Sequence, residues 1–116
     1  MKDTVLYFVL PCYNEEEVLP ETAKRLFAKY NKLLRANKIS DESRILFVND
    51  GSSDRTWEII KKLHEWNPAF SGLSLSRNRG HQNALLAGLM TARKYCDISV
   101  SMDADLQDDI EAVDEM

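Results

Sequence analysis

The stretch Thr4-Val5-Leu6-Tyr7-Phe8-Val9-Leu10 decides the fold, because it is continuously apolar and rich in residues that favour β-strands. A strand with one face in water would alternate polar and apolar side chains, and this stretch does not alternate. It therefore predicts a central strand of a parallel sheet, covered by other elements on both faces. We expect Pro11 to end the strand and a loop, residues 12–17, to follow at its carboxyl end.

Three more strands and three helices are predicted downstream. The strands cover residues 44–48, 70–76 and 98–102, and the third one alternates as an edge strand would. Helices are predicted from Leu19, with Pro20 in the first turn, over 54–66 with Ser53 as the cap, and over 82–95. The order β-α-β-α-β-α-β predicts an α/β fold with a mostly parallel sheet and helices on both faces.

The helices show buried stripes at regular spacing. In the third helix Ala84 and Gly88 are small enough for close packing on the sheet. The residues expected to be buried are Leu19, Ala23, Leu26, Tyr30, Leu33 and Asn37 in the first helix, Trp57, Ile60, Leu63 and Trp66 in the second, and Leu85, Leu89 and Ala92 in the third.

Length and composition limit the class of protein. The 116 residues allow one domain, residues 1–116, and 44% hydrophobic with 29% charged residues is ordinary for a globular fold. No apolar run is long enough to span a bilayer, and the start does not resemble a signal peptide. Cys12 and Cys96 lack metal or redox spacing and are expected to be small core residues. The net charge of −4 argues against nucleic acid as a partner.

An acidic cluster follows the fourth predicted strand. Asp103, Asp105 and Gln107 come where that strand ends, so their oxygens can converge on one point. Such hard oxygen ligands suit Mg²⁺ or Mn²⁺, and a metal with open positions can hold a diphosphate. Taken alone, the pattern fits a solvated acidic turn better than a metal site, because it is short and common.

Polar clusters also follow the other three strands. In an open α/β sheet, ligands bind outside the carboxyl ends of the strands, so the repetition favours one shared site over four separate turns. A tyrosine can lie against a base, and arginines suit phosphate oxygens. The clusters are Tyr13 and Glu15 after the first strand, Asp50 and Ser52 after the second, and Arg77 and Arg79 after the third.

Five motifs in order resemble the amino-terminal half of family 2 glycosyltransferases, in the branch that contains dolichol-phosphate mannosyltransferase and bacterial polyprenyl-phosphate glucosyltransferases. The resemblance covers nearly the whole chain. The motifs are Pro11-x-Tyr13-Asn14-Glu15, Val48-Asn49-Asp50-Gly51-Ser52-Ser53-Asp54-x-Thr56, Leu75-Ser76-Arg77-Asn78-x-Gly80, Ala84-Leu85-Leu86-Ala87-Gly88-Leu89 and Met102-Asp103-Ala104-Asp105-Leu106-Gln107-Asp108.

The resemblance implies a Rossmann-like GT-A fold and metal-dependent transfer of a sugar, with inversion, from a UDP- or GDP-sugar to a polyprenyl phosphate. The nucleotide-sugar would be held by Pro11, Tyr13, Glu15, Val48, Asp50, Arg77, Asp103, Ala104 and Asp105, and Mg²⁺ or Mn²⁺ by Asp103, Asp105 and Gln107. His81 replaces the lysine often found after the loop glycine, which leaves a phosphate contact there in doubt.

Several alternatives remain open on the sequence. A glycan hydroxyl acceptor would need a carboxylate base, which we expect beyond Met116 rather than at Asp108 or Asp109. A binding-only homologue is also compatible with the motifs. A phospho-receiver module is disfavoured, since the third strand ends in Ser-Arg-Asn rather than in a phospho-accepting aspartate.

The chain is expected to be a soluble, inactive fragment of a longer protein at the cytoplasmic face of a membrane. Residues 108–116 read as the first turns of a helix, and the acceptor half of the family is absent. Apolar surface left by that half predicts self-association.

Overall fold

The computed structural model describes residues 4–102 of the chain. Strands and helices alternate in the predicted order, although their ends differ in places. The strands are β1 (Leu6–Cys12), β2 (Arg44–Asp50), β3 (Phe70–Leu75) and β4 (Ile98–Ser101), and the helices are α1 (Leu19–Arg35), α2 (Thr56–Trp66) and α3 (His81–Ala92).

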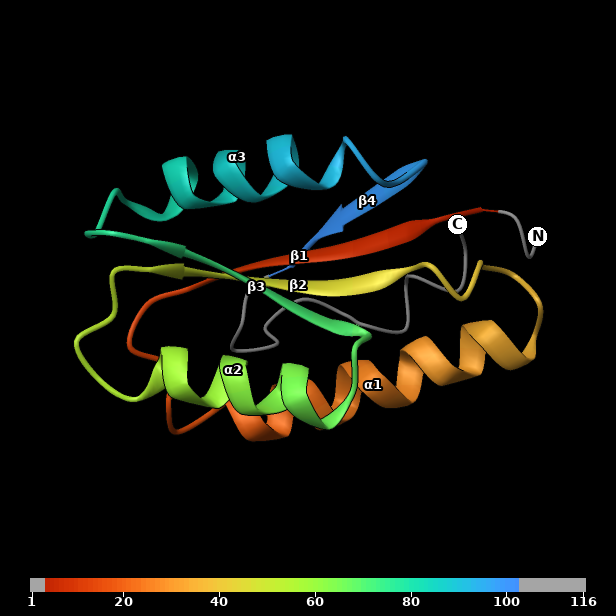
Figure 1. The fold of residues 1–116 in the computed structure, drawn as a ribbon, viewed down its shortest axis with the longest axis horizontal. Coiled ribbons are helices and arrows are strands. Elements are labelled where there is room, and N and C mark those ends of the chain that lie inside the picture. The colour runs from red at the N-terminus through yellow and green to blue at the C-terminus, as the bar shows by residue number, and fades with distance from the viewer. Residues whose placement is uncertain (1–3, 103–116) are drawn as a thin grey trace.

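The strands form one parallel sheet in the order β3-β2-β1-β4. β1 therefore lies inside the sheet, as its apolar sequence predicts, and β3 lies at an edge. Helices α1 and α2 cover one face and α3 covers the other (Figure 1). Alternate strand residues divide between two cores, so that Phe8 and Phe47 pack toward α1 and α2, while Val9 and Val48 pack toward α3. The predicted α/β architecture is confirmed.

The prediction that Pro11 ends the first strand is wrong, because β1 continues to Cys12 and Pro11 pairs with Val48 of β2. Backbone groups of alternate residues in a strand point to opposite neighbours. The carbonyl of Val9 points toward β4, where it accepts the Met102 N–H at 3.0 Å. Pro11 lies two residues further along the strand, so its backbone groups also face β4 rather than β2. The missing N–H of Pro11 therefore costs no bond to β2.

Helix α1 begins at Leu19 with a proline in its first turn, as predicted. The expected stripe from Leu19 to Leu33 is buried, and the Tyr30 hydroxyl donates to the Ser43 carbonyl at 2.9 Å. The prediction that Asn37 is a buried residue of this helix is wrong. Asn37 lies beyond the helix, is exposed, and has a φ of 60°, a left-handed conformation that asparagine tolerates better than most residues.

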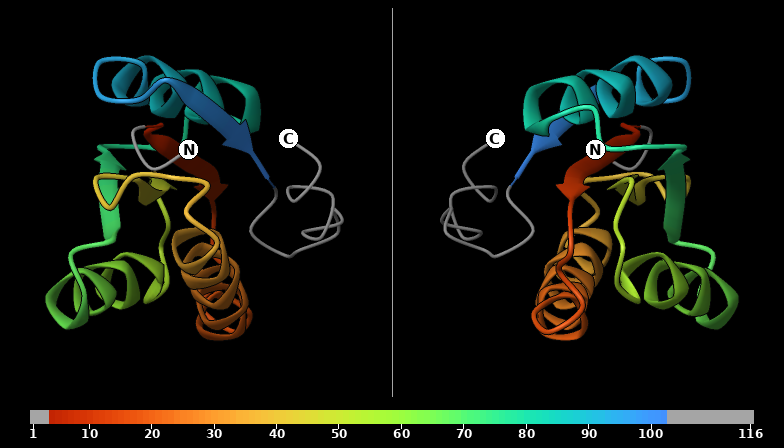
Figure 2. Two further views of the ribbon diagram at one scale, coloured as in Figure 1. Left: turned by 90° about the vertical axis from the view of Figure 1, so that its right-hand side faces the viewer. Right: turned by 90° about the vertical axis from the view of Figure 1, so that its left-hand side faces the viewer.

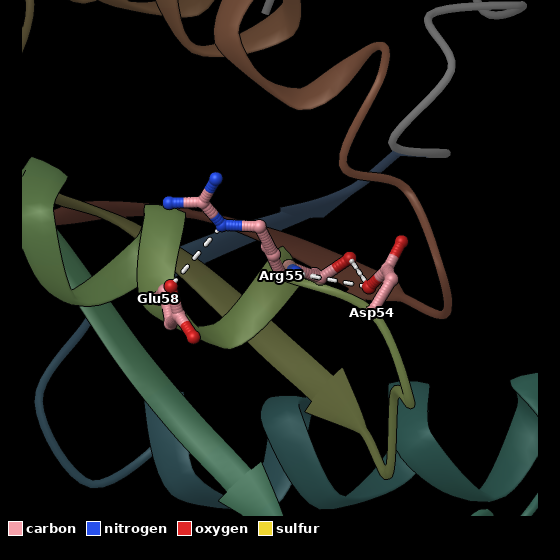
Figure 3. A network of polar contacts seen from close by, with 4 residues as sticks. Asp54, Arg55 and Glu58 are labelled. Carbon is pink, nitrogen blue, oxygen red and sulfur yellow. Dashed lines mark hydrogen bonds and ion pairs between the residues drawn. The ribbon is translucent and has the colours of Figure 1, made fainter.

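Helix α2 begins at Thr56 with Arg55 at the N-cap position, so the prediction that Ser53 caps the helix is wrong. Asp54, not Ser53, accepts the Thr56 N–H at 2.9 Å, and it also accepts the Thr56 hydroxyl at 2.6 Å and the Glu16 N–H at 3.2 Å. Asp54 and the adjacent Arg55–Glu58 ion pair, 3.2 Å between Nε and Oε2, are shown in Figure 3. Asp54 thus ties the start of α2 to the loop that follows β1.

Helix α2 is less buried than its spacing predicts. Ile60 is buried and Trp57 and Leu63 are half-buried, but the Trp66 side chain is 66% exposed. Trp66 lies in the last turn, where its ring meets Phe27 edge-on with 5.0 Å between ring centroids. Periodicity placed Trp66 on the correct side of the helix, yet α1 covers only part of the ring.

Helix α3 meets the sheet through its smallest residues, which are Ala84, Gly88 and Ala92. A Cβ atom on Gly88 would lie 2.6 Å from methyl groups of both Val9 and Val48. The close packing predicted for Ala84 and Gly88 is confirmed, whereas the predicted Leu85 and Leu89 are only half-buried.

We predict that Gly88→Ala lowers the free energy of unfolding by about 1–2 kcal/mol. The overpacking against the two valines costs more than the roughly 1 kcal/mol that alanine gains over glycine in a helix. Urea denaturation measures the effect. Leu86→Ala, on the exposed side of α3, is the control and should change stability by no more than about 0.5 kcal/mol. A more stable Gly88→Ala variant would show that α3 does not need this close contact.

We predict that Asp54→Ala destabilises the fold by about 1 kcal/mol, while Ser53→Ala does not, because only Asp54 accepts the Thr56 N–H. Burial alone would raise the pKa of Asp54, but hydrogen bonds from Thr56 and from the Glu16 N–H outweigh it and lower the pKa below its ordinary 3.8. The stabilisation is therefore present above that pH and is lost as pH falls through the lowered pKa. Thermal melts of both variants at pH 7 and at acidic pH check this, and equal losses in the two variants at pH 7 would contradict it.

Candidate functional site

The carboxyl ends of β1, β2 and β3 lie at one edge of the sheet (Figure 1), and the loops that follow them are held together by hydrogen bonds. We call residues 13–17, 50–56 and 76–80 at this edge the rim. The rim brings together four of the predicted nucleotide-sugar residues, which are Tyr13, Glu15, Asp50 and Arg77.

Asn14 joins the first loop to the second. Its N–H donates to the Ser52 hydroxyl at 3.0 Å, and its side-chain oxygen accepts the Ser53 N–H at 2.9 Å. Asn14 has a φ of 52°, which places its side chain and backbone so that both reach the same partner loop. One residue later, the Glu15 N–H donates to the Thr56 hydroxyl at 2.8 Å. The backbone beside Tyr13 is therefore fixed on the β2–α2 loop.

Asp50 joins the second loop to the third. Its carboxylate is buried at the end of β2 and accepts the N–H groups of Arg79 and Gly80 at 2.7 and 3.1 Å. Neighbouring Asn49 donates its amide to the Ser74 hydroxyl at 3.0 Å. The prediction that Asn49 and Asp50 lie in a loop is wrong, because both belong to β2 and pair with β3.

Gly51 allows the closest approach at the rim. It has a φ of +66°, and an added Cβ would collide with the backbone of Arg77 and Asn78. Any other residue would strain the turn and push the two loops apart. The glycine therefore determines how close Arg77 lies to the loop that carries Ser52.

The predicted site residues differ in accessibility. Tyr13 and Arg77 are exposed and Glu15 is half-buried, so these side chains lie where a ligand can meet them. Pro11 and Val48 are buried, and Val48 lies under Gly88 of α3. A ligand contact with Pro11 or Val48 through the side chain would need a local rearrangement.

The predicted metal ligands Asp103, Asp105 and Gln107, together with Ala104, lie outside the described residues. Within residues 4–102 no group of three His, Cys, Asp or Glu side chains is placed to hold a metal ion. β4 runs parallel to β1 up to Met102, so the chain heads toward the rim at that point.

Two residues that organise the rim, Asn14 and Thr56, have no role predicted from the sequence. Asn14 and Thr56 were part of the quoted motifs, but their importance depends on contacts between loops about 40 residues apart. Cys12, at the end of β1, is buried, and burial raises the pKa of its thiol, so it is a core residue as expected. Of the described helices, none combines the length and apolarity that crossing a membrane requires.

A family model described as glycosyl transferase family 2 matches residues 7–116. The chain is 49% identical over 109 residues to the uncharacterized glycosyltransferase YkoT of Bacillus subtilis, a stretch that covers 94% of the chain and 32% of that relative. It is 41% identical over 105 residues to the prophage bactoprenol glucosyl transferase homolog of Escherichia coli, covering 90% of the chain and 32% of the relative. The chain thus spans about a third of the length of these relatives.

The fold also matches a solved structure, the mannosyltransferase PcManGT from Pyrobaculum calidifontis in complex with GDP-Man and Mn²⁺. The TM-score is 0.68 at 23% identity, with 88% of this chain and 28% of that chain covered, so the likeness supports the GT-A type of α/β fold. Because the family model matches nearly the whole chain, the protein belongs to glycosyl transferase family 2.

Proposed function

We propose that the chain is the donor-binding part of an enzyme that transfers a sugar, with inversion, from a UDP- or GDP-sugar to a polyprenyl phosphate at a membrane. The observation that carries the proposal is the rim, where three loops at the carboxyl edge of a parallel sheet are fixed by hydrogen bonds from backbone N–H groups to side-chain oxygens. Such an edge is where open α/β sheets bind ligands. Membership of a glycosyltransferase family gives the chemistry that this edge would serve.

The exposed side chains of the rim suit the parts of a nucleotide-sugar. The half-exposed ring of Tyr13 offers a flat face for a base, and the exposed guanidinium of Arg77 suits phosphate oxygens. Asp50 has both carboxylate oxygens engaged by backbone N–H groups, so its first role is to hold the loop that carries Arg77. A nucleoside contact at Asp50 would have to share these oxygens.

A divalent cation fits the donor set that follows β4. Asp103, Asp105 and Gln107 offer hard oxygens, which Mg²⁺ and Mn²⁺ prefer, and β4 carries the chain toward the rim. When bound there, the cation would neutralise negative charge on the departing nucleoside diphosphate. The residues of this chain would hold the donor and orient its diphosphate.

A polyprenyl phosphate is the preferred acceptor because of the similarity to a bactoprenol glucosyl transferase homolog. A lipid phosphate is already anionic near neutral pH and needs no strong general base, unlike a glycan hydroxyl. We expect the acceptor site in the two thirds of the relatives' length that this chain does not span.

We predict that metal and nucleotide together stabilise the chain and that Asp103→Asn with Asp105→Asn abolishes this gain. Ligand at a hundred times its Kd should add about 2.7 kcal/mol of stability. Thermal melts with EDTA, with Mn²⁺, and with Mn²⁺ plus UDP or GDP provide the measurement. Asp114→Asn with Glu115→Gln removes the same charge and should keep the gain. An equal gain in the Asp103/Asp105 variant would exclude these aspartates as the metal site.

We also predict that Tyr13→Ala weakens nucleotide binding about tenfold, because stacking of a base on an aromatic ring contributes roughly 1–3 kcal/mol. Calorimetric titration with UDP and GDP in the presence of Mn²⁺ measures the change in Kd. The control is Tyr95→Ala, another exposed tyrosine, which lies beyond the end of α3 and should leave Kd unaltered. If both variants bind like the parent chain, Tyr13 does not contact the base.

A further inference from the structure

Acidic residues are absent from one long segment of an otherwise acidic chain. Between Glu65 and Asp97 there is no aspartate or glutamate, although the whole chain has a net charge of −4. The same segment carries four basic residues, two on each side of α3, and these are Arg77, Arg79, Arg93 and Lys94. All four are exposed. The face that α3 forms is therefore positively charged, whereas the other residues of 4–102 are nearly balanced, with 10 basic and 11 acidic side chains.

Helix α3 also exposes apolar side chains on its outer side. Leu86 and Met90, one turn apart, are 54% and 55% exposed, opposite the buried Ala84 and Gly88. Figure 2 shows α3 as the layer on its side of the sheet, and among residues 4–102 it is the only helix there. A helix that is apolar on all sides normally has a partner on each side. The sheet covers one side of α3, and the side that carries Leu86 and Met90 stays exposed among residues 4–102.

The carboxyl end of α3 continues this apolar surface. Tyr95, just beyond the helix, is 63% exposed and stacks on Tyr7 with 6.4 Å between ring centroids. Ile98, at the start of β4, is also exposed. A tyrosine ring with a polar hydroxyl suits the boundary between water and lipid.

Helix α1 shows that positive charge alone does not define such a surface. Its outer side carries exposed Lys24 and Arg25, but its large apolar side chains are buried or half-buried against the sheet and α2. That arrangement is an ordinary solvated helix face. Among the helices of residues 4–102, only α3 combines exposed apolar residues, flanking basic residues and a lack of acidic ones.

We propose that the outer face of α3, formed by Leu86, Met90, Tyr95, Arg93 and Lys94, docks on an anionic lipid bilayer. The apolar side chains would enter the region between headgroups and acyl chains, and the basic ones would meet lipid phosphates. An anionic membrane surface complements the positive charge of this face. Pairing with a second copy would instead bring two positive faces together.

Docking by α3 would orient the rim. The loop that carries Arg77 leads directly into the first turn of α3, so a helix lying on the bilayer holds this loop beside the lipid surface. A lipid-borne acceptor would then be near the donor. This inference goes beyond the proposed function, and the two can fail separately, because one concerns vesicle binding and the other nucleotide binding.

The test is flotation of the purified 116-residue chain with vesicles of phosphatidylcholine alone and of phosphatidylcholine with phosphatidylglycerol in equal parts. The chain should bind only the anionic vesicles, and less so at high salt. Arg93→Gln with Lys94→Gln should lower the partition coefficient about 20- to 30-fold, at roughly fivefold for each charge. Leu86→Gln with Met90→Gln should lower it at least about tenfold.

The matched control is Lys24→Gln with Arg25→Gln on α1, which removes the same charge from the opposite layer and should alter binding less than about threefold. Circular dichroism verifies the fold of each variant, and the charge variant alone decides the matter if the Leu86/Met90 variant unfolds. Absence of binding to anionic vesicles, or equal losses in the α1 and α3 charge variants, would overturn the proposal. So would a lipid-free dimer that the Leu86/Met90 variant disrupts, because it would identify a second copy as the occupant.

Discussion

The buried carboxylate of Asp50 is the interaction on which the rim depends. A buried carboxylate is tolerated when its oxygens are hydrogen-bonded, and here the N–H groups of Arg79 and Gly80 meet that need. The end of β2 thereby fixes the loop that leaves β3, and with it the position of Arg77 and the start of α3. Gly51 follows directly and lets the same two loops touch. The geometry of the site thus depends on backbone groups rather than on contacts between long side chains.

Because of this arrangement, the polar residues of the sequence Asn49-Asp50-Gly51-Ser52 can be assigned two roles, ligand binding or support of the site. Read as a list of ligands, it offers a carboxylate and hydroxyls to a nucleotide. In the structure, Asp50 and Ser52 each use side-chain oxygen to hold a neighbouring loop. Asn49 donates its amide to Ser74 of β3 and accepts the Ser52 N–H. Of the predicted site residues, Tyr13 and Arg77, which the loops carry, keep their side chains exposed at the surface. A motif of this kind can therefore build a site while leaving much of the ligand contact to its neighbours.

The sequence predicted the number, kind and order of the elements, because apolar runs and helical spacing are local signals. Their ends were less predictable. Asn49 and Asp50 were assigned to a loop for their polarity, yet their backbones pair with Ser74 and Leu75. A local rule, that proline ends a strand, also led to the wrong end for β1. What matters is that the backbone nitrogen of Pro11 faces β4 rather than β2, so its missing N–H removes no hydrogen bond to β2. The exposure of Trp66 depends on how far α1 reaches across α2, which spacing along α2 cannot reveal.

Helix α3 shows a related limit, since a helix that is apolar on all sides gives no periodic signal for direction. Small residues settled which side meets the sheet, and only the structure showed Leu86 and Met90 on the outside.

The position of β1 inside the sheet has a consequence for the growing polypeptide. β1 is synthesised before the other three described strands, but its second neighbour, β4, is complete only when Ser101 has been added. At about 5–20 residues per second, translation leaves one side of an apolar strand without a partner for several seconds. The nascent chain therefore emerges from the ribosome with its most hydrophobic strand half-paired, in the period when chaperones compete with aggregation for it.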